Sequence, residues 1–248
     1  MTDAIVLHAF DYRETSRILR LATREVGVRS VIARGARRPK NRFGTALDLF
    51  AEGSAQIALH ATRDLHTLIS YDVTRAKPAL AGRWTRFAAA NALSEILLRF
   101  AGDDTQPGLY EAYASALAAL ERAEDDAHAA GLAGAWTLVA ELGFAPSLDA
   151  CASCGTVLDS EASVRFVHRT GGALCAKCAT HAAGARELPA TARVAIAAWV
   201  GGRTPPVPDP KSTLAHLRLL REFLSEHLAD ERPLRAFAVW ERGDWLPR

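Results

Sequence analysis

Short runs in which apolar and polar residues alternate occupy the first third of the chain and predict β-strands. β-Branched residues are frequent in these runs, and no helical periodicity separates most of them. The five predicted strands cover residues 4–10, 17–23, 28–34, 56–60 and 68–73. Ile57 and Leu59 are expected to share one face of the fourth strand, and Ile69, Tyr71 and Val73 one face of the fifth. Five short antiparallel strands predict a small β-barrel, either an OB-fold or an SH3-like barrel.

Beyond Lys77 and Pro78 the apolar positions recur at spacings of three and four, which predicts amphipathic helices. We expect the resulting stripes to form a helical core, with further helices over residues 189–200 and 211–229 on either side of a proline-rich loop. The stripes comprise Leu93, Ile96, Leu97 and Phe100; Tyr110, Tyr113, Ala114, Leu117 and Leu120; Leu132, Ala135, Trp136, Val139 and Leu142; and Leu217, Leu220, Leu224 and Leu228.

This change of periodicity predicts an α+β chain of two domains. Residues 1–78 are expected to form the barrel, with the OB-fold preferred, and residues 79–248 an all-helical domain into which a zinc knuckle is inserted at about 148–182. A length of 248 residues suffices for two small domains, and 49% hydrophobic and 23% charged residues exclude a disordered or fibrous chain. The sequence contains no long uncharged apolar run and no basic segment before its first apolar run, so we expect neither a membrane span nor a signal peptide, and a cytoplasmic location.

All four cysteines lie within one short segment, as two C-x-x-C pairs formed by Cys151 and Cys154 and by Cys175 and Cys178. Two such pairs about twenty residues apart are typical of a structural zinc site, because each turn directs two thiolates at one centre. Four protein ligands leave no open position, so the prediction is structural Zn²⁺ rather than a catalytic metal. The alternatives are free or redox-active thiols, and replacement of one thiolate by His181.

The net charge of +2 conceals an asymmetry, because residues 1–80 hold 13 lysines and arginines against 8 acidic residues. Six of these cations lie within residues 29–42, which contain no acid and are interrupted by a glycine and a proline, as expected of a loop between strands. Arginine donates paired hydrogen bonds to phosphate, and nucleic acids bind OB-folds at such loops. The predicted DNA-binding residues are Arg29, Arg34, Arg37, Arg38, Lys40 and Arg42; the alternative is a solvated loop.

Two aromatic residues near this segment, Tyr12 and Phe43, are candidates for stacking on DNA bases, although Phe43 could instead anchor the loop on the barrel. A second, weaker basic stripe consists of Lys211, Arg218 and Arg221, whose spacing of seven and three places them on one helix face. It would either form a secondary DNA surface or be ordinary surface charge.

Sequence signatures of common enzymes are missing from the chain. It has no phosphate-binding loop, no dinucleotide-binding turn, no nucleophile elbow and no H-E-x-x-H motif. The eight histidines are scattered, and none pairs with acidic residues at a recognisable catalytic spacing. The sequence therefore argues against an ATPase, a hydrolase or a nuclease, and predicts a protein that is not an enzyme.

Three stretches, in the same order along the chain, resemble the RecO family of bacterial DNA repair proteins. They are the segment with Ser16-Arg17-Ile18, Thr23, Gly27 and Ala33-Arg34-Gly35-Ala36-Arg37; LGFAPSLDACASCG at residues 142–155; and GGALCAKC at residues 171–178. The resemblance implies an N-terminal OB-fold and a helical domain that carries a zinc knuckle. It also implies binding of single- and double-stranded DNA and annealing of complementary strands.

As partners the resemblance implies RecR and the single-strand-binding protein, whose displacement lets RecA load, and it implies a pocket for the tail of the single-strand-binding protein on the helical domain. The sequence as a whole therefore predicts a nucleoid-associated recombination mediator that helps to load the recombinase onto coated DNA. The competing hypothesis is a zinc-containing protein-interaction or transcription-type module in which the basic loop is incidental.

Overall fold

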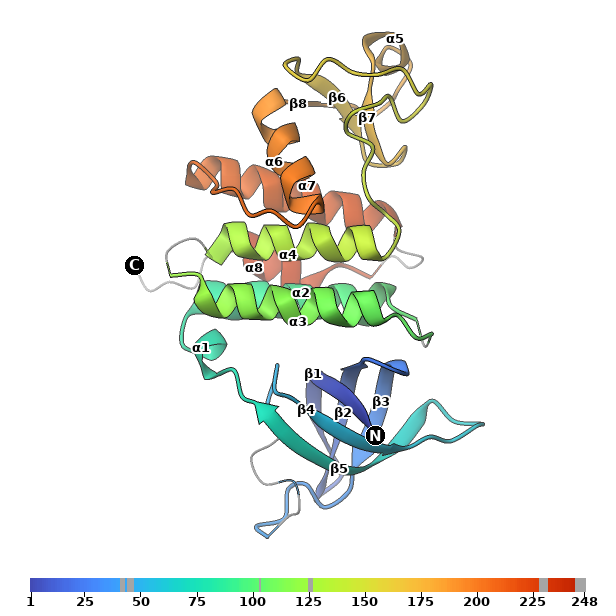
Figure 1. Cartoon of the computed structure of the whole chain (residues 1–248), viewed down its shortest axis with the longest axis vertical. Coiled ribbons are helices and arrows are strands. Elements are labelled where there is room, and N and C mark those ends of the chain that lie inside the picture. The colour runs from blue at the N-terminus through green and yellow to red at the C-terminus, as the bar shows by residue number, and fades with distance from the viewer. Residues whose placement is uncertain (41–42, 44–46, 103, 125–126, 228–231, 244–248) are drawn as a thin grey trace.

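Five strands close into a barrel at one end of the molecule (Figure 1). They are β1 (Thr2–Tyr12), β2 (Ser16–Thr23), β3 (Gly27–Ala33), β4 (Glu52–Ala58) and β5 (Leu65–Arg75). The computed structural model describes residues 1–40, 43, 47–102, 104–124, 127–227 and 232–243. The strand order is β1-β2-β3-β5-β4, and β3 pairs with β5 in parallel whereas the other pairs are antiparallel. This topology is that of the OB-fold, so the expectation of five antiparallel strands is wrong for the β3–β5 pair.

Alternate residues of the strands fill the barrel interior, and the Tyr71 hydroxyl ties two strand ends together there. It donates to the carbonyl oxygen of either Ala4 (2.9 Å) or Ala51 (2.8 Å), and both acceptors lie within reach. Tyr71 is buried, and burial raises the pKa of its hydroxyl above the ordinary range. The interior comprises Ala4, Val6, Leu19, Leu21, Val31, Ala33, Phe43, Leu47, Ala51, Ala55, Leu68 and Tyr71.

A β-bulge in β5 changes which of its residues face inward. Ile57 pairs with Leu68 and Gln56 with Ser70, so Ile69 is the extra, unpaired residue of β5. Leu68 consequently takes the inward position and is fully buried, whereas Ile69 is 37% exposed. The expectation that Ile69 shares the buried face of Tyr71 is therefore wrong, because strict alternation cannot anticipate an inserted residue. Leu59 also lies beyond the end of β4 and is exposed.

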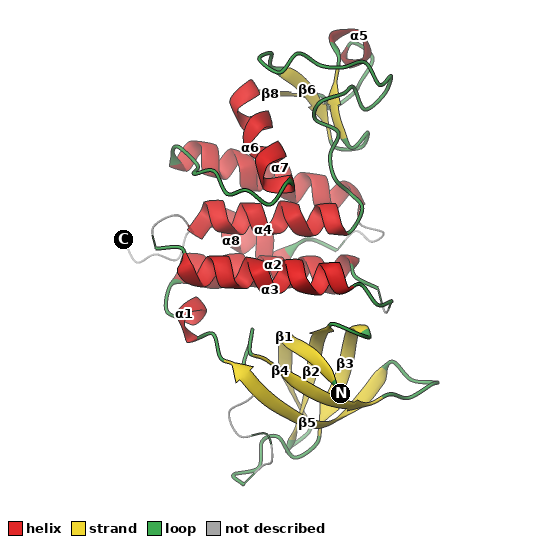
Figure 2. Cartoon of the chain, in the orientation of Figure 1, coloured by secondary structure: helices red, strands yellow, loops and turns green. Residues whose placement is uncertain are grey.

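The helices form layers between the barrel and the knuckle (Figures 1 and 2). After the short α1 (Pro78–Ala81) come α2 (Trp84–Phe100), α3 (Pro107–Arg122) and α4 (Ala127–Glu141). α6 (Ala190–Val200), α7 (Pro210–His227) and α8 (Arg235–Arg242) complete the layers. The predicted apolar stripes are buried in one continuous core, apart from the partly buried Phe100, Ala114 and Leu142 and from Leu228, which lies outside the described residues. None of the helices among these residues is long and apolar enough to cross a membrane.

The last helix, α8, was not expected from the sequence. Its first backbone amides donate to the carboxylate of Glu95 on α2, at 2.8 Å from Arg235 and 2.9 Å from Ala236. A carboxylate at this position satisfies amides that lack a partner within the helix. Trp240 then packs over Gly131 of α4, where a Cβ atom would lie 2.5 Å from the indole. The helix therefore depends on tertiary contacts that its mixed sequence does not reveal.

The barrel joins the helices through one half of its outer surface. Ile5, Leu7, Ala22 and Val28 point out of the barrel and belong to the helical core. The buried ammonium of Lys77 lies 3.3 Å from the carboxylates of both Glu52 on β4 and Glu121 on α3. This contact links barrel and helices by two ion pairs from one cation.

Removing the Tyr71 hydroxyl should weaken the barrel. Tyr71→Phe leaves the buried carbonyl oxygens of Ala4 and Ala51 without this donor, so we expect a loss of about 1–3 kcal/mol in the free energy of unfolding. Chemical denaturation measures the loss, with the partly exposed Tyr12→Phe as the matched control. Equal stability of the two variants would contradict the role given to Tyr71.

Candidate nucleic-acid interface and metal centre

Two loops meet at the end of the barrel that faces away from the helices (Figure 1). The backbone amide of Arg37, in the β3–β4 connection, donates to the carbonyl oxygen of Thr15 in the β1–β2 turn at 3.0 Å. Its guanidinium also donates to the carbonyl oxygen of Arg13 at 3.5 Å. Gly35 (φ +75°) allows the tight turn that the amide of Arg38 closes onto its carbonyl oxygen. The basic segment is thus held against a second loop.

The cationic side chains gathered at this end form a surface that we call the cationic rim. Arg34, Arg38 and Lys40 are exposed, and Arg34 and Lys40 have no hydrogen-bond or ion-pair partner within the described part of the chain. The carboxylate of Asp11 forms ion pairs with the guanidiniums of both Arg17 (3.4 Å) and Arg37 (3.3 Å). These ion pairs orient the two guanidiniums and neutralise part of their positive charge. The rim comprises Arg13, Arg17, Arg34, Arg37, Arg38 and Lys40.

Not every predicted DNA-binding residue belongs to the rim. Arg29 is a half-buried residue of β3 that pairs with Leu21. It lies five positions before Arg34, which is about 16 Å along an extended strand. Arg42 lies outside the described residues. Conversely, Arg13 and Arg17 join the rim through the turn geometry, which the linear charge pattern of residues 29–42 could not reveal.

The two aromatic candidates have different surroundings. Phe43 is only 3% exposed and packs inside the barrel, so the expectation that it stacks on bases is wrong. Tyr12 is half-buried, and the guanidinium of Arg13 lies 5.3 Å from its ring centroid in a cation–π contact. Phe10, on the same strand as Tyr12, is 44% exposed, and it is not among the sequence-based candidates for base stacking.

The second basic stripe is divided between two environments. Arg221 forms an ion pair with Glu241 of α8 at 2.5 Å and is therefore engaged within the protein. Lys211 and Arg218 instead border a pocket, and Arg218 lies 3.5 Å from Glu222. The three residues do not form one free basic surface.

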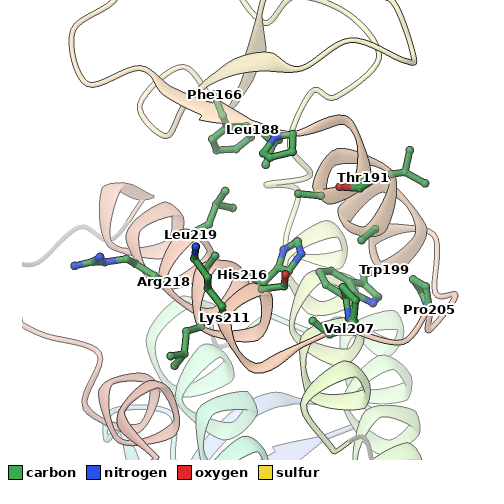
Figure 3. Close-up of a pocket in the computed structure, with 18 of the residues that line it drawn as sticks. Phe166, Leu188, Thr191, Trp199, Pro205, Val207, Lys211, His216, Arg218 and Leu219 are labelled. Atoms are coloured by element: carbon green, nitrogen blue, oxygen red, sulfur yellow. The ribbon is translucent and has the colours of Figure 1, made fainter.

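That pocket, of about 1070 Å³, lies between α6, α7 and the small sheet of the knuckle (Figure 3). Its lining is mainly apolar and includes Trp199, Leu188 and Val207. The His216 ring packs edge-on against Trp199 at 4.7 Å, and burial lowers the pKa of His216 to about 4, so this ring is neutral at pH 7. Five cations also line the pocket, together with the carboxylates of Glu187, Glu222 and Glu241; the cations are Arg186, Arg203, Lys211, Arg218 and Arg242. An apolar partner segment that carries carboxylates would match this lining.

The four cysteines converge at the opposite end of the molecule from the rim. All four Sγ atoms lie within 4.8 Å of one another, and those of Cys154 and Cys175 are 3.8 Å apart. A tetrahedral site with metal–sulfur bonds of about 2.3 Å requires sulfur–sulfur separations of about 3.8 Å. The thiols are not disulfide-bonded, and His181 lies outside the cluster. The four cysteines can therefore bind a metal ion together.

Local hydrogen bonds hold each cysteine pair in its turn. The amide of Gly155 (φ +74°) donates to the carbonyl oxygen of Cys151 at 2.9 Å, and the amide of Ala179 donates to that of Cys175 at 2.9 Å. The second pair spans the step from β7 (Gly172–Leu174) into α5 (Ala176–Ala179). Backbone amides, that of Cys175 foremost, lower the pKa of the Cys151 thiol to about 6. The turn at Cys151 thus favours the thiolate form that metals bind, whereas hydrogen bonds with the Cys175 and Cys154 thiols raise the pKa of Cys178 to about 12.

The knuckle also forms a wall of the pocket. β6 (Val164–Val167) pairs with β7 on one side and with β8 (Arg186–Leu188) on the other. Phe166 of β6 and Leu188 of β8 line the pocket, while the buried core beneath the cysteines is limited to Cys151, Val167 and Leu174. Val164, Phe166, Ala173 and Leu188 anchor the sheet in the helical core, so a bound metal would mainly stabilise the cysteine-bearing turns, whose own core is small.

Loss of the metal should therefore destabilise the knuckle first. We expect about one metal ion per chain by elemental analysis, and loss of that ion in Cys154→Ser together with faster proteolysis within residues 148–182 and a lower unfolding temperature. Ser153→Ala, between the same two cysteines, is the control. Full metal content in Cys154→Ser would refute the four-thiolate site.

Comparisons with known proteins agree with this architecture. A family model described as "Recombination protein O N terminal" matches residues 1–76, and one described as "Recombination protein O C terminal" matches residues 82–236. The first covers the barrel, and the second covers the knuckle and the helices from α2 to α7.

Curated relatives match over most of the chain. The DNA repair protein RecO of Anaeromyxobacter sp. (strain K) is 37% identical over 240 residues, which cover 94% of this chain and 93% of the relative. That of Geobacter metallireducens is 32% identical over 239 residues, covering 96% and 95%. That of Symbiobacterium thermophilum is 32% identical over 188 residues, covering 75% and 74%.

Proposed function

The chain belongs to the RecO family of DNA repair proteins, and from this premise we propose that it is a non-enzymatic recombination mediator. In this role it binds single- and double-stranded DNA, anneals complementary strands, and helps to load the recombinase onto DNA coated by single-strand-binding protein. The observation that carries the proposal is the cationic rim at the end of the OB-fold remote from the helices.

The rim would act on the phosphate backbone. Exposed guanidinium and ammonium groups on neighbouring loops can neutralise phosphates of two strands at once, which removes much of the repulsion that opposes annealing. Base pairing is then downhill and needs no nucleotide cofactor. Because phosphate contacts carry no base information, recognition would be largely independent of sequence. Asp11 would keep Arg17 and Arg37 oriented, while Arg34 and Lys40 offer their full charge.

The pocket supports the second half of the proposal, the binding of partner proteins. We assign it to the tail of the single-strand-binding protein, and assign Lys211 and Arg218 to this pocket rather than to a secondary DNA surface. RecR would be a further partner, and the loading of RecA onto DNA would be helped indirectly. A protein-interaction module without DNA binding is the alternative that the pocket alone would favour.

The remaining assignments follow from the donor atoms and the chain topology. Four thiolates in a tetrahedral set favour Zn²⁺ in a structural role, and elemental analysis distinguishes zinc from iron.

We propose residues 1–78 as the DNA-binding domain and residues 79–248 as the partner-binding domain. The proposed location is the cytoplasm, in association with the nucleoid.

Charge reversal in the rim should weaken DNA binding. For Arg34→Glu/Arg38→Glu we expect affinity for single-stranded oligonucleotides to fall about tenfold or more for each phosphate that the variant no longer binds, because hydrogen bonds between charged groups contribute about 1.5–3 kcal/mol. The slope of log affinity against log salt should become shallower by about 0.7 for each such phosphate. Fluorescence anisotropy over a salt series measures both, and strand annealing should slow in parallel.

The matched control is Arg122→Glu/Arg169→Glu, which changes the net charge equally at exposed positions of the helical domain and the knuckle. An equal loss of affinity in the control would mean that overall charge, rather than the rim, controls binding. Undiminished binding by the rim variant would contradict the proposed site.

Reversal of the pocket cations should instead weaken partner binding. Arg203 and Lys211 have no ion-pair partner within the described ranges, so Arg203→Glu/Lys211→Glu should lower the affinity for a labelled tail peptide of the single-strand-binding protein about fivefold. Binding of bare DNA should persist. If peptide binding were unchanged but DNA binding fell, the two residues would belong to a secondary DNA surface.

A further inference from the structure

One stretch of the barrel's outer surface combines exposed aromatic side chains with apolar residues on the neighbouring strands. After the bulge at Leu7, the outward-facing residues of β1 are His8, Phe10 and Tyr12. Phe10 is 44% exposed, and its ring centroid lies 5.8 Å from that of His8. Phe10 is thus an exposed aromatic ring with a second ring beside it.

The neighbouring strands extend this surface in register. Phe10 pairs with Ile18 on β2, and Ile18 pairs with Ile32 on β3, so the three side chains form one row across the outside of the barrel. Ile18 is nearly buried and Ile32 is half-buried beside it. A single exposed apolar residue needs no explanation, but Phe10 lies at the edge of a continuous row of apolar residues.

The row continues directly into the cationic rim. Tyr12 is the next outward residue after Phe10, about 7 Å along β1, and it carries the guanidinium of Arg13 over its ring. Asp11, between them in sequence, holds Arg17 and Arg37 of the rim. Cations that can bind phosphates and exposed aromatic rings therefore lie side by side at the end of β1, as the phosphates and bases of a nucleotide chain do.

From this juxtaposition we infer that His8 and Phe10 form a base-stacking platform for single-stranded DNA, with the rim holding the phosphates beside it. The inference rests on the proposed function and adds the part of the site that contacts bases. Stacking uses the π-face that every base presents, so it would add affinity without sequence preference. A duplex hides its base faces, so the platform would act on single strands and the rim on both forms.

The test compares two oligonucleotides that carry the same number of phosphates. One is an oligothymidylate and the other an abasic strand of equal length, and both are titrated against the full-length protein. The wild type should bind the oligothymidylate more tightly, and Phe10→Ala should lose about tenfold in affinity for it while its affinity for the abasic strand stays unchanged. The salt slope should not change, since the groups that bind phosphate are all retained.

Three further variants make the outcome specific. Phe10→Tyr retains a ring and should retain the preference for bases, whereas Phe10→Leu is apolar without a ring and should lose it. Leu214→Ala, at an apolar side chain of α7 that is 50% exposed, is the control for loss of surface. Because Phe10 is partly exposed, the alanine and leucine variants should keep the wild-type unfolding temperature, and the leucine variant decides the matter if the alanine variant does not.

The outcomes separate the two proposals. Equal wild-type affinity for both strands, or an unchanged preference in Phe10→Leu, would overturn the platform and leave phosphate binding by the rim intact. Failure of the wild type to bind either strand would overturn the proposed DNA-binding function itself.

Discussion

The packing of one half of the barrel's outer surface onto the helices determines where everything else can lie. Ile5, Leu7 and Val28 point outward yet are buried in the helical core, so that half of the barrel is unavailable to a ligand. The bulge at Leu7 ends this buried zone, because the outward positions beyond it, from His8 onward, face solvent. A ligand of the barrel can therefore approach the remaining outer surface and the far loops, which are the parts that carry the cations and the exposed ring.

Charged residues also differ between the junction with the helices and the free end of the barrel. At the junction the buried Lys77 is matched by Glu52 and Glu121, so the cation there serves cohesion rather than binding. At the rim, by contrast, Asp11 is shared by two arginines, and exposed cations remain beyond them. A net charge of +2 is thus compatible with a polyanion-binding surface, because the acids of the helical domain balance a local excess of positive charge at one end.

Much of this architecture could be predicted from the sequence because it is periodic or local. Alternation revealed the strands, spacings of three and four revealed Leu93, Tyr113 and Leu217 as core, and two C-x-x-C turns sufficed for the metal cluster. What escaped prediction depends on contacts distant in sequence: the bulge at Ile69, the capping of α8 by Glu95, and the three-stranded knuckle sheet. For Phe43 the sequence offered both outcomes, and its burial inside the barrel agrees with the loop anchor rather than with base stacking.

The placement of the metal cluster explains how a purely structural ion could still influence function. The cysteines lie at the end of the molecule opposite the rim, so the ion cannot contact DNA held there. β6 and β8, however, leave the cluster to form one wall of the pocket, where Arg186 joins Glu222 of α7 at 2.8 Å. Because the core beneath the cysteines is small, a bound ion would stabilise the two cysteine-bearing turns, while Val164, Phe166 and Leu188 anchor the sheet in the helical core. Metal binding would therefore reach the pocket only through β6 and β8 and leave the loops of the cationic rim unaffected.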